Sequence, residues 1–318
     1  MKKFNNITIA VVIPYYNAEK HVVQVVQKLP NFITNVILVD DKGEQPLPVA
    51  DLKLVCQDRF ELIVLQSPQN LGVGGATKIG FKHAIATQID IVIKVDADDQ
   101  MDTSYLEEMI VPIVENGAEM VKGNRFVDTR ALLKMPFVRR IGNLGISFMA
   151  KAATGYWSNF DPTNGFLVIE SKTLRKIDFE KLANRYFFET SLMAELNFVK
   201  ARIKDVSMPA IYADEKSSMQ VWKMPFLFST KLIKLFFKRI LKQYFLFDFN
   251  IASLYIFFGV PLFLFGVISG VYNWWFYSSR EVFAPTGTIM LDTLSIILGF
   301  QLLLQAIQYD VFNAPKAE

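Results

Sequence analysis

The C-terminal part of the chain contains an uncharged stretch that a soluble fold can seldom bury. No Asp, Glu, Lys or Arg occurs between Asp248 and Arg280, and the segment Ile251–Tyr272 is almost wholly apolar. A helix needs about 20 apolar residues to cross the hydrocarbon layer of a bilayer. We therefore expect a transmembrane helix at residues 251–272.

A second segment of the same kind follows at Thr288–Tyr309, with a single charge at Asp292. The two segments predict a hairpin, whose connecting loop carries one cation, Arg280. The segment before the hairpin carries seven cations: Lys216, Lys223, Lys231, Lys234, Lys238, Arg239 and Lys242. The positive-inside rule therefore places this flank and both termini in the cytoplasm. The alternative is a pair of core helices in a soluble protein.

Residues 214–249 combine lysines at three- and four-residue spacing with aromatic and aliphatic residues. We interpret this part as a basic amphipathic helix on an anionic membrane surface, the alternative being a solvated face packed on the preceding domain. The expected organisation is a domain at 1–213, the basic segment at 214–249, the hairpin at 250–310 and a cytoplasmic tail at 311–318.

The first part of the chain alternates short apolar runs with segments of helical period. The expected strands are Ile7–Ile13, Val36–Val39, Leu62–Leu65 and Ile89–Val95, and the expected helices are Ala18–Leu29, Gly74–Ala86 and Thr103–Glu115. This alternation predicts an α/β domain with a mostly parallel sheet. The polar motifs "PYYN", "VDD", "NLGVGG" and "DADDQ" all fall at strand ends. Ligands of such sheets bind beyond the carboxyl ends of the strands, so we expect one site there.

Composition excludes several other classes of function. The formal net charge is only +3, which gives no support to nucleic-acid binding. Cys56 is the single cysteine, which rules out an intrachain disulfide, and two histidines make a zinc site improbable. The polar start and the short run that ends at Pro14 do not resemble a signal peptide.

The stretch "KVDADDQM" suggests a divalent metal. Asp96, Asp98 and Gln100 alternate along an extended segment and would point the same way, whereas Asp99 would face away as an N-cap or a loop acid. Carboxylate oxygens suit Mg²⁺ or Mn²⁺, which also take ligands from phosphates. The glycines of "NLGVGGA", at the start of a helix, would admit a diphosphate, and Asp40 or Asp41 would bind a base or ribose or form a turn.

The motifs "VVIPYYNAEK", "VDD", "NLGVGGA", "DADDQM", "KGNRF", "DPTNGF" and "YFFET" occur in an order that resembles the family 2 glycosyltransferases of GT-A fold. With the hairpin, the chain is similar to membrane-anchored polyprenyl- or dolichyl-phosphate sugar synthases. The resemblance implies a metal and diphosphate site at Asp96, Asp98 and Gln100. It also implies that the nucleotide sugar is bound by Pro14, Tyr16, Asn17, Asp40, Asn70, Gly72 and Asp96.

The chain departs from this pattern at four places. Ala18 separates Asn17 from Glu19, and "DPTNGF" has Asn164 where such enzymes show Ser and Leu167 where they show Arg. The segment "DEKSSM" replaces an Arg-containing one, so that Lys216 would contact the donor phosphates. These differences bear mainly on the identity of the acceptor.

The class of acceptor should determine which types of residue the site contains. A hydroxyl acceptor must lose a proton to a base, whereas a lipid phosphate is already an anion and needs cations. The Glu-Asp pair of many hydroxyl-transferring relatives reads Glu189-Thr190 here, which favours phosphate, although Glu189 or Asp161 could still act as a base. The candidates to bind the acceptor phosphate are Arg125, Arg139 and Arg140. The alternative for Arg139 and Arg140 is that they are solvated residues near the start of a helix.

We therefore expect a cell-envelope enzyme that uses Mg²⁺ or Mn²⁺ to move a sugar, with inversion, from a nucleotide-diphosphate sugar to polyprenyl phosphate. Asp98, Arg125, Asp161 and Glu189 are the candidate catalytic residues. The alternatives are transfer to a hydroxyl of a lipid-linked saccharide and a non-catalytic membrane protein that binds nucleotide sugars. Expected partners are the donor, the acceptor and membrane lipids but no nucleic acid, and assembly into a homo-oligomer is left open.

Overall fold

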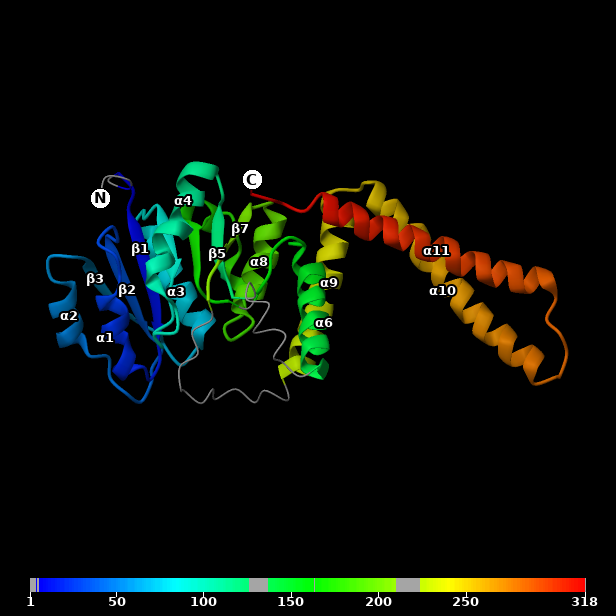
Figure 1. The fold of residues 1–318 in the computed structure, drawn as a ribbon, viewed down its shortest axis with the longest axis horizontal. Helices are drawn as coiled ribbons and strands as arrows, with labels where there is room; N and C mark the ends of the chain where they lie inside the picture. Colours follow the sequence, from blue (N-terminus) through cyan, green and yellow to red (C-terminus); the bar gives the residue numbers. More distant parts are fainter. Residues whose placement is uncertain (1–3, 5, 126–136, 163, 210–223, 318) are drawn as a thin grey trace. The chain divides into compact units, whose positions relative to one another are not determined.

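The computed structural model describes residues 4, 6–125, 137–162, 164–209 and 224–317, with only the backbone of 137–144 and 224–227 (Figure 1). The chain divides into two compact units. One comprises Met1–Leu235 with Pro315–Glu318, and the other comprises Phe236–Ala314.

The first unit is built on a seven-stranded sheet of order β3-β2-β1-β4-β6-β5-β7. The strands are β1 Ile9–Tyr15, β2 Asn35–Asp40, β3 Glu61–Gln66, β4 Ile91–Lys94, β5 Met120–Asn124, β6 Leu167–Glu170 and β7 Ile203–Ser207. All neighbouring strands are parallel except that β6 runs antiparallel to both β4 and β5. The predicted α/β domain with a mostly parallel sheet is confirmed.

Helices cover both faces of this sheet (Figure 1). They are α1 Glu19–Gln27, α2 Val49–Cys56, α3 Val73–Ala86, η1 Thr103–Tyr105, α4 Leu106–Asn116, α6 Phe137–Thr154, α7 Ser171–Leu174, η2 Phe179–Lys181 and α8 Phe188–Phe198. Alternate residues of β1 face opposite layers, because successive side chains of a strand point to opposite faces. Val11 packs in the cluster that contains Val22 of α1, and Val12 packs in the cluster that contains Phe81 of α3.

The register of the sheet brings several strand ends to one edge. Tyr15 at the end of β1 pairs with Asp40 at the end of β2, and Lys94 at the end of β4 pairs with Leu167 at the start of β6. Because β6 is antiparallel to β5, Leu167 also pairs with Lys122, near the end of β5. The segments after β1, β2, β4 and β5 and the segment before β6 therefore all meet at this edge.

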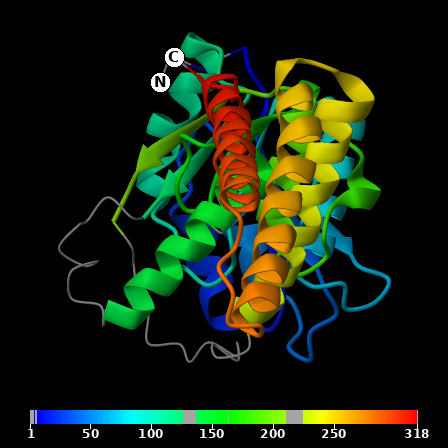
Figure 2. The same cartoon turned by 90° about the vertical axis from the view of Figure 1, so that its right-hand side faces the viewer.

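Two long helices make up most of the second unit: α10, Ile251–Ser278, and α11, Thr286–Phe312. Both are long and apolar enough to cross a membrane, and they pack along each other (Figure 2). They are preceded by α9, Met224–Leu241, and a π-helical turn, η3, Lys242–Phe247. The expected pair of long apolar helices is confirmed.

Buried polar contacts fix the helices of the second unit. Arg239 donates two hydrogen bonds to Asp310, both of 2.8 Å, and Tyr244 donates a third to the same carboxylate. Nearer the other end of the hairpin, Asp292 accepts hydrogen bonds from Ser269 and Asn273 of α10. A buried charge is tolerated only when it is paired or hydrogen-bonded, and both carboxylates meet this condition.

Candidate functional site

A cavity of about 420 Å³ lies at the carboxyl ends of β1 and β2. Four of the predicted nucleotide-binding residues line it: Pro14, Tyr16, Asn70 and Gly72. Asp41, Arg185 and Tyr186 also line it, although the sequence analysis assigned a role only to the first of them. The cavity thus joins two strand ends with the amino-terminal end of α3.

Asp41 shapes this cavity by holding the glycine-rich loop. Its carboxylate is buried and accepts hydrogen bonds from the backbone amides of Leu71, at 2.9 Å, and Gly72, at 2.7 Å. Gly72 has a φ of 84°, and a Cβ there would lie 2.9 Å from the carbonyl oxygen of Asn184. Only glycine fits such a position without strain, so the loop requires it.

Three of the seven predicted nucleotide-binding residues lie outside this lining: Asn17, Asp40 and Asp96. Asp40 accepts a hydrogen bond from the backbone amide of Lys42 and lies outside the cavity lining. Because neighbouring residues point to opposite sides of an extended segment, Asp41 rather than Asp40 faces the cavity. Asn17 also lies outside the lining, and its side-chain oxygen accepts from the amide of Gln45.

A buried lysine links two of the predicted site carboxylates. Lys94 is fully buried, and its Nζ lies 2.6 Å from Asp96 Oδ1 and 3.3 Å from Glu189 Oε1. Glu189 comes from the first turn of α8, so the lysine joins the strand end to a helix on one face of the sheet. Gly165 completes the cluster, since its carbonyl accepts from Lys94 at 3.4 Å.

The charges in this cluster shift one another's protonation. Burial alone would lower the pKa of Lys94, but the charges of Asp96 and Glu189 and their hydrogen bonds hold that pKa above its ordinary value. Burial raises the pKa of Glu189, and the charge of Asp96 raises it further while Lys94 lowers it. Lys94 is therefore held as an ammonium ion between the side chains of Asp96 and Glu189.

The acids of "DADDQ" have different neighbours. Asp96 contacts Lys94, Asp98 Oδ1 accepts from the backbone amide of Gln100, and Asp99 forms an ion pair with Lys28. Asp99 has a φ of 60°, which turns the chain at this point. The N-cap of the following helical turn is Asp102, whose side chain accepts from Ser104, so of the two roles expected for Asp99 only that of a loop acid remains.

The oxygen atoms of this segment suit a hard divalent cation. Asp96 and Asp98 supply carboxylate oxygens and Gln100 an amide oxygen, which are ligand types that Mg²⁺ and Mn²⁺ accept. Among the described residues no group of three or more His, Cys, Asp or Glu side chains is arranged to hold a metal ion. Such a segment fits a cation that takes its remaining ligands from a substrate diphosphate.

Arg125 and Asp161 form a second ion pair at this edge. The guanidinium donates from Nε and Nη2 to the two carboxylate oxygens, at 2.7 and 2.9 Å. Asp161 is fully buried, whereas the Arg125 side chain is 43% exposed. The buried Lys122 donates to the backbone carbonyls of Phe160 and Asp161 and so fixes the loop that carries Asp161.

The remaining predicted phosphate ligands lie outside the described side chains. Arg139 and Arg140 belong to α6, of which only the backbone is described at these positions. Lys216 lies outside the described residues. Their roles stay predictions.

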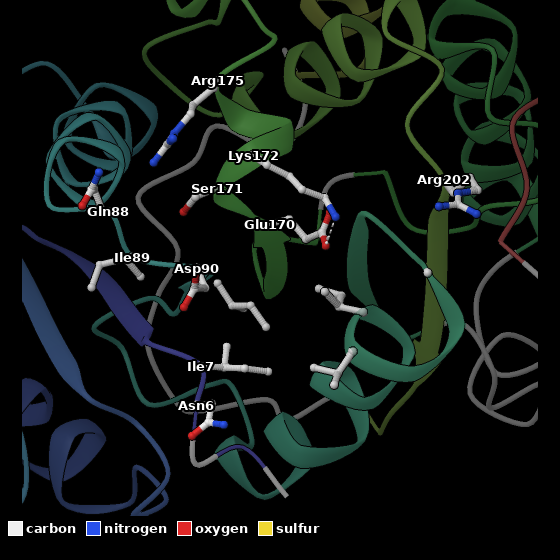
Figure 3. Close-up of a pocket in the computed structure, with 14 residues that line it drawn as sticks. Asn6, Ile7, Gln88, Ile89, Asp90, Glu170, Ser171, Lys172, Arg175 and Arg202 are labelled. Carbon is white, nitrogen blue, oxygen red and sulfur yellow. Dashed lines mark ion pairs between the residues drawn. The ribbon is translucent and has the colours of Figure 1, made fainter.

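A larger cavity, of about 610 Å³, occupies the opposite edge of the sheet, near Ile7, Asp90 and Ile91 (Figure 3). The predicted site residues that the structure describes do not line it. Two of its cations have acidic partners, since Lys172 pairs with Glu170 and Arg202 with Glu119. We therefore place the functional site at the carboxyl-end edge, where the carboxylates and the glycine-rich loop meet.

Five residues at this edge have no role predicted from the sequence: Lys94, Lys122, Gly165, Arg185 and Tyr186. A signal existed for Lys94, because a lysine inside the apolar run "IVIKV" has to be buried with a partner. Lys122 in "MVKGN" gives the same signal. Arg185, Tyr186 and Gly165 lie in irregular segments, and periodicity could not have placed them.

Comparison with known proteins identifies relatives that act on lipid phosphates. The chain is 30% identical over 220 residues to the UDP-N-acetylglucosamine–dolichyl-phosphate N-acetylglucosaminyltransferase of Methanococcus voltae, covering 65% of this chain and 86% of that protein. It is 22% identical over 210 residues to the undecaprenyl-phosphate mannosyltransferase of Micrococcus luteus, covering 64% and 83%.

Among solved structures, glucosyl-3-phosphoglycerate synthase from Mycobacterium tuberculosis, in complex with Mn²⁺, UDP and phosphoglyceric acid, is similar at a TM-score of 0.54. The identity is 16%, and the match covers 74% of this chain and 79% of that one. This likeness shows the GT-A fold. Residues 10–185, more than half of the chain, match the family described as glycosyl transferase family 2, so the chain belongs to that family and is a glycosyltransferase.

Proposed function

We propose that the protein transfers a sugar from a nucleotide-diphosphate donor to polyprenyl phosphate at the cytoplasmic face of a membrane. The two relatives described above are named for dolichyl-phosphate and undecaprenyl-phosphate acceptors, which supports a lipid phosphate. The observation that carries the proposal is the pairing of the carboxylates at the site. Asp161 is bound by Arg125, and Asp96 and Glu189 share Lys94.

This pairing supports one of the two acceptor classes. A hydroxyl acceptor needs a base within reach of its proton. Asp161 is fully buried and both its oxygens accept from Arg125, and Glu189 is buried behind Lys94. A phosphate acceptor needs no base, and the half-exposed guanidinium of Arg125 offers it a fixed cation. The geometry supports the phosphate.

Apolar side chains near the same edge would suit the hydrocarbon chain of the acceptor. Phe160, next to Asp161 in the chain, is 49% exposed. Phe148 of α6 is also exposed, and its ring packs edge-on against Trp157. Exposed aromatic groups of this kind commonly mark a contact surface for an apolar partner.

The helix α9 supports contact with the membrane surface. Its residues Ile233, Phe237 and Leu241 are four positions apart, lie on one face and are all exposed. Lys234 follows Ile233 and is exposed as well. A helix with exposed apolar and basic side chains suits an anionic bilayer surface.

Each part of the site has a role in the proposed reaction. The cavity at Pro14, Tyr16 and Asn70 would hold the nucleotide, with the glycine-rich loop near its diphosphate. A divalent ion bound at Asp96, Asp98 and Gln100 would neutralise charge on the departing nucleoside diphosphate. Arg125 would hold the acceptor phosphate for direct displacement, which inverts the anomeric centre.

A transfer assay tests the proposal. The purified full chain, in lipid nanodiscs with Mg²⁺ or Mn²⁺, is supplied with a panel of labelled nucleotide sugars and polyprenyl phosphate as the sole acceptor. We expect label in that lipid. In a parallel assay with a lipid-linked saccharide as acceptor, transfer there and none to polyprenyl phosphate would refute the proposal in favour of a hydroxyl acceptor with Glu189 or Asp161 as base. Nucleotide-sugar binding without transfer to either acceptor would also refute it.

A further inference from the structure

The end of β4 carries a cation at a place where a metal-binding segment is expected to be anionic. Lys94 and Val92 are two residues apart in β4, so their side chains point to the same face of the sheet. Val92 packs in the layer formed with α3 and α8. The side chain of Lys94 therefore points toward α8, where it contacts Glu189. Its Nζ also contacts Asp96, which follows two residues later in the chain. The ammonium group lies 2.6 Å from Asp96 Oδ1.

This ammonium group competes with a metal ion for the same carboxylate. Asp96 and Asp98 are the acidic residues of the proposed metal site, and the ammonium group of Lys94 offsets part of their negative charge. Metal affinity of oxygen sites rises with the number of charged ligands. A cation already bound to Asp96 therefore weakens the affinity of the nucleotide-free protein for a second one.

We propose that Lys94 occupies the cation position beside Asp96 in the nucleotide-free protein and thereby makes divalent-ion binding depend on the nucleotide. This inference rests on the proposed function, because it takes Asp96 and Asp98 as metal ligands. The donor diphosphate brings the negative charge and the oxygen ligands that the site lacks. Lys94 is then a positioning residue that acts through Asp96.

The neighbours of Lys94 limit how far it can move. A Cβ at Gly165 would lie 2.5 Å from Lys94 Nζ and 2.8 Å from Asp96 Oδ2. The Lys94–Asp96 pair therefore fits only because residue 165 has no side chain. Glu189 Oε1 lies 3.3 Å from the same Nζ. When a metal ion takes Asp96, Glu189 can keep the ammonium group paired. The cluster therefore has a second partner for Lys94 already in place.

The decisive measurement is the affinity for Mn²⁺ alone, followed by the electron paramagnetic resonance signal of the free ion. Removing only Lys94 would leave Glu189 buried and unpaired, which threatens folding. The test variant is therefore the double substitution Lys94→Gln with Glu189→Gln, and its charge-matched control is the unsubstituted protein. The double variant has the same net charge as the unsubstituted protein, so tighter binding by it reports competition at Asp96 and not total charge.

We expect the double variant to bind Mn²⁺ at least about tenfold more tightly than the unsubstituted protein in the absence of nucleotide. Equal or weaker binding would overturn the inference. Addition of UDP or, separately, GDP should increase Mn²⁺ affinity more in the unsubstituted protein than in the double variant, by reciprocal coupling. An equal change in the two proteins, including none, would also overturn it.

A further substitution separates this inference from the proposed metal site. Asp98→Asn, added to the double variant, should abolish the tight binding of Mn²⁺. If it leaves that binding unchanged, the proposed metal site is wrong. If Asp98→Asn weakens Mn²⁺ binding while the double variant and its control bind alike, the metal site stands and only the role of Lys94 is wrong.

Discussion

At the scale of single residues, the backbone turn at Asp99 gives the acids of "DADD" different neighbours. Asp96 and Asp98 stay near the strand end, whereas Asp99 pairs with Lys28, which follows α1. Lys28 is more than half exposed, and an ion pair of this kind contributes at most about 1 kcal/mol. Neighbouring carboxylates can thus differ widely in importance for activity.

Substitution of the two neighbouring acids should therefore give unequal losses. Asp98→Ala removes a metal ligand, and we expect kcat to fall at least about 100-fold. Asp99→Ala removes only the pair with Lys28 and should lower the rate little. Steady-state kinetics of both variants with saturating Mn²⁺ measure this difference. Equal losses would show that our assignment of the two side chains is wrong.

Gly165 offers a second test, because its environment is crowded by the site itself. Gly165→Ala would place a methyl group 2.5 Å from Lys94 Nζ and 2.8 Å from Asp96 Oδ2. We expect this methyl group to displace the pair and to reduce turnover by at least about tenfold. Gly145→Ala in α6 is the matched control, since no atom lies within 4 Å of a Cβ there. Similar activity of the two variants would contradict the expectation.

At this scale the sequence predicts which motifs lie together better than which residue of a motif faces the ligand. Strand-end motifs gather at one edge because parallel strands share a direction, so Pro14, Tyr16, Asn70 and Gly72 could be predicted to line one cavity. The choice between Asp40 and Asp41 depends on where β2 ends, and strand ends are uncertain by a few residues. Lys94 meets Glu189 only through tertiary packing, which a local pattern does not specify.

At the scale of elements, the predicted strands are nearly continuous apolar runs, and the predicted helices have an apolar pattern of helical period. The expected strand Ile7–Ile13 corresponds to β1, Ile9–Tyr15, and the expected helix Gly74–Ala86 corresponds to α3, Val73–Ala86. The sequence pattern does not predict the later strands β5, β6 and β7, of which β5 and β7 contain charged residues such as Lys122 and Asp205. Their pairing supplies the partners that make these charges acceptable in a sheet, and a single-sequence pattern cannot show that pairing.

The Lys122–Asp205 contact shows how a charged strand pair supports the site. Lys122 Nζ lies 3.6 Å from Asp205 Oδ1, and Asp205 also accepts from the side chain of Asn159 and the amide of Phe160. Burial lowers the pKa of Lys122, against the charges of Asp205 and Asp161. These contacts fix the loop that presents Asp161 to Arg125.

Loss of this lysine should therefore affect stability and the site together. Lys122→Met leaves the largely buried Asp205 without its cation, and we expect the free energy of unfolding to fall by about 3 kcal/mol. Pulse proteolysis in a urea series, on protein in detergent, measures the change. Adding Asp205→Asn should restore part of the stability because it removes the unpaired charge. No rescue by the second substitution would argue against the ion pair as the cause.

At the scale of the whole molecule, the distribution of charge along the chain predicts orientation in the membrane. Six cations besides the buried Arg239 precede the hairpin between residues 216 and 242, whereas the loop between α10 and α11 carries Arg280 alone. Each basic residue near an anionic cytoplasmic surface is stabilised by about 1 kcal/mol. The sum over the flank is large, so the hairpin loop should face the outside.

Cysteine labelling tests this orientation directly, because Cys56 is the only native cysteine. In a Cys56→Ala background, single cysteines are placed at Phe283 in the hairpin loop and at Lys316 near the C-terminus, both exposed positions. We expect a membrane-impermeant maleimide to label Phe283→Cys in intact cells and Lys316→Cys only after lysis. The background protein without either cysteine is the control for unspecific labelling. The reverse pattern would place the catalytic domain outside the cytoplasm, and labelling of both positions in intact cells would contradict a hairpin that crosses the membrane with both termini inside.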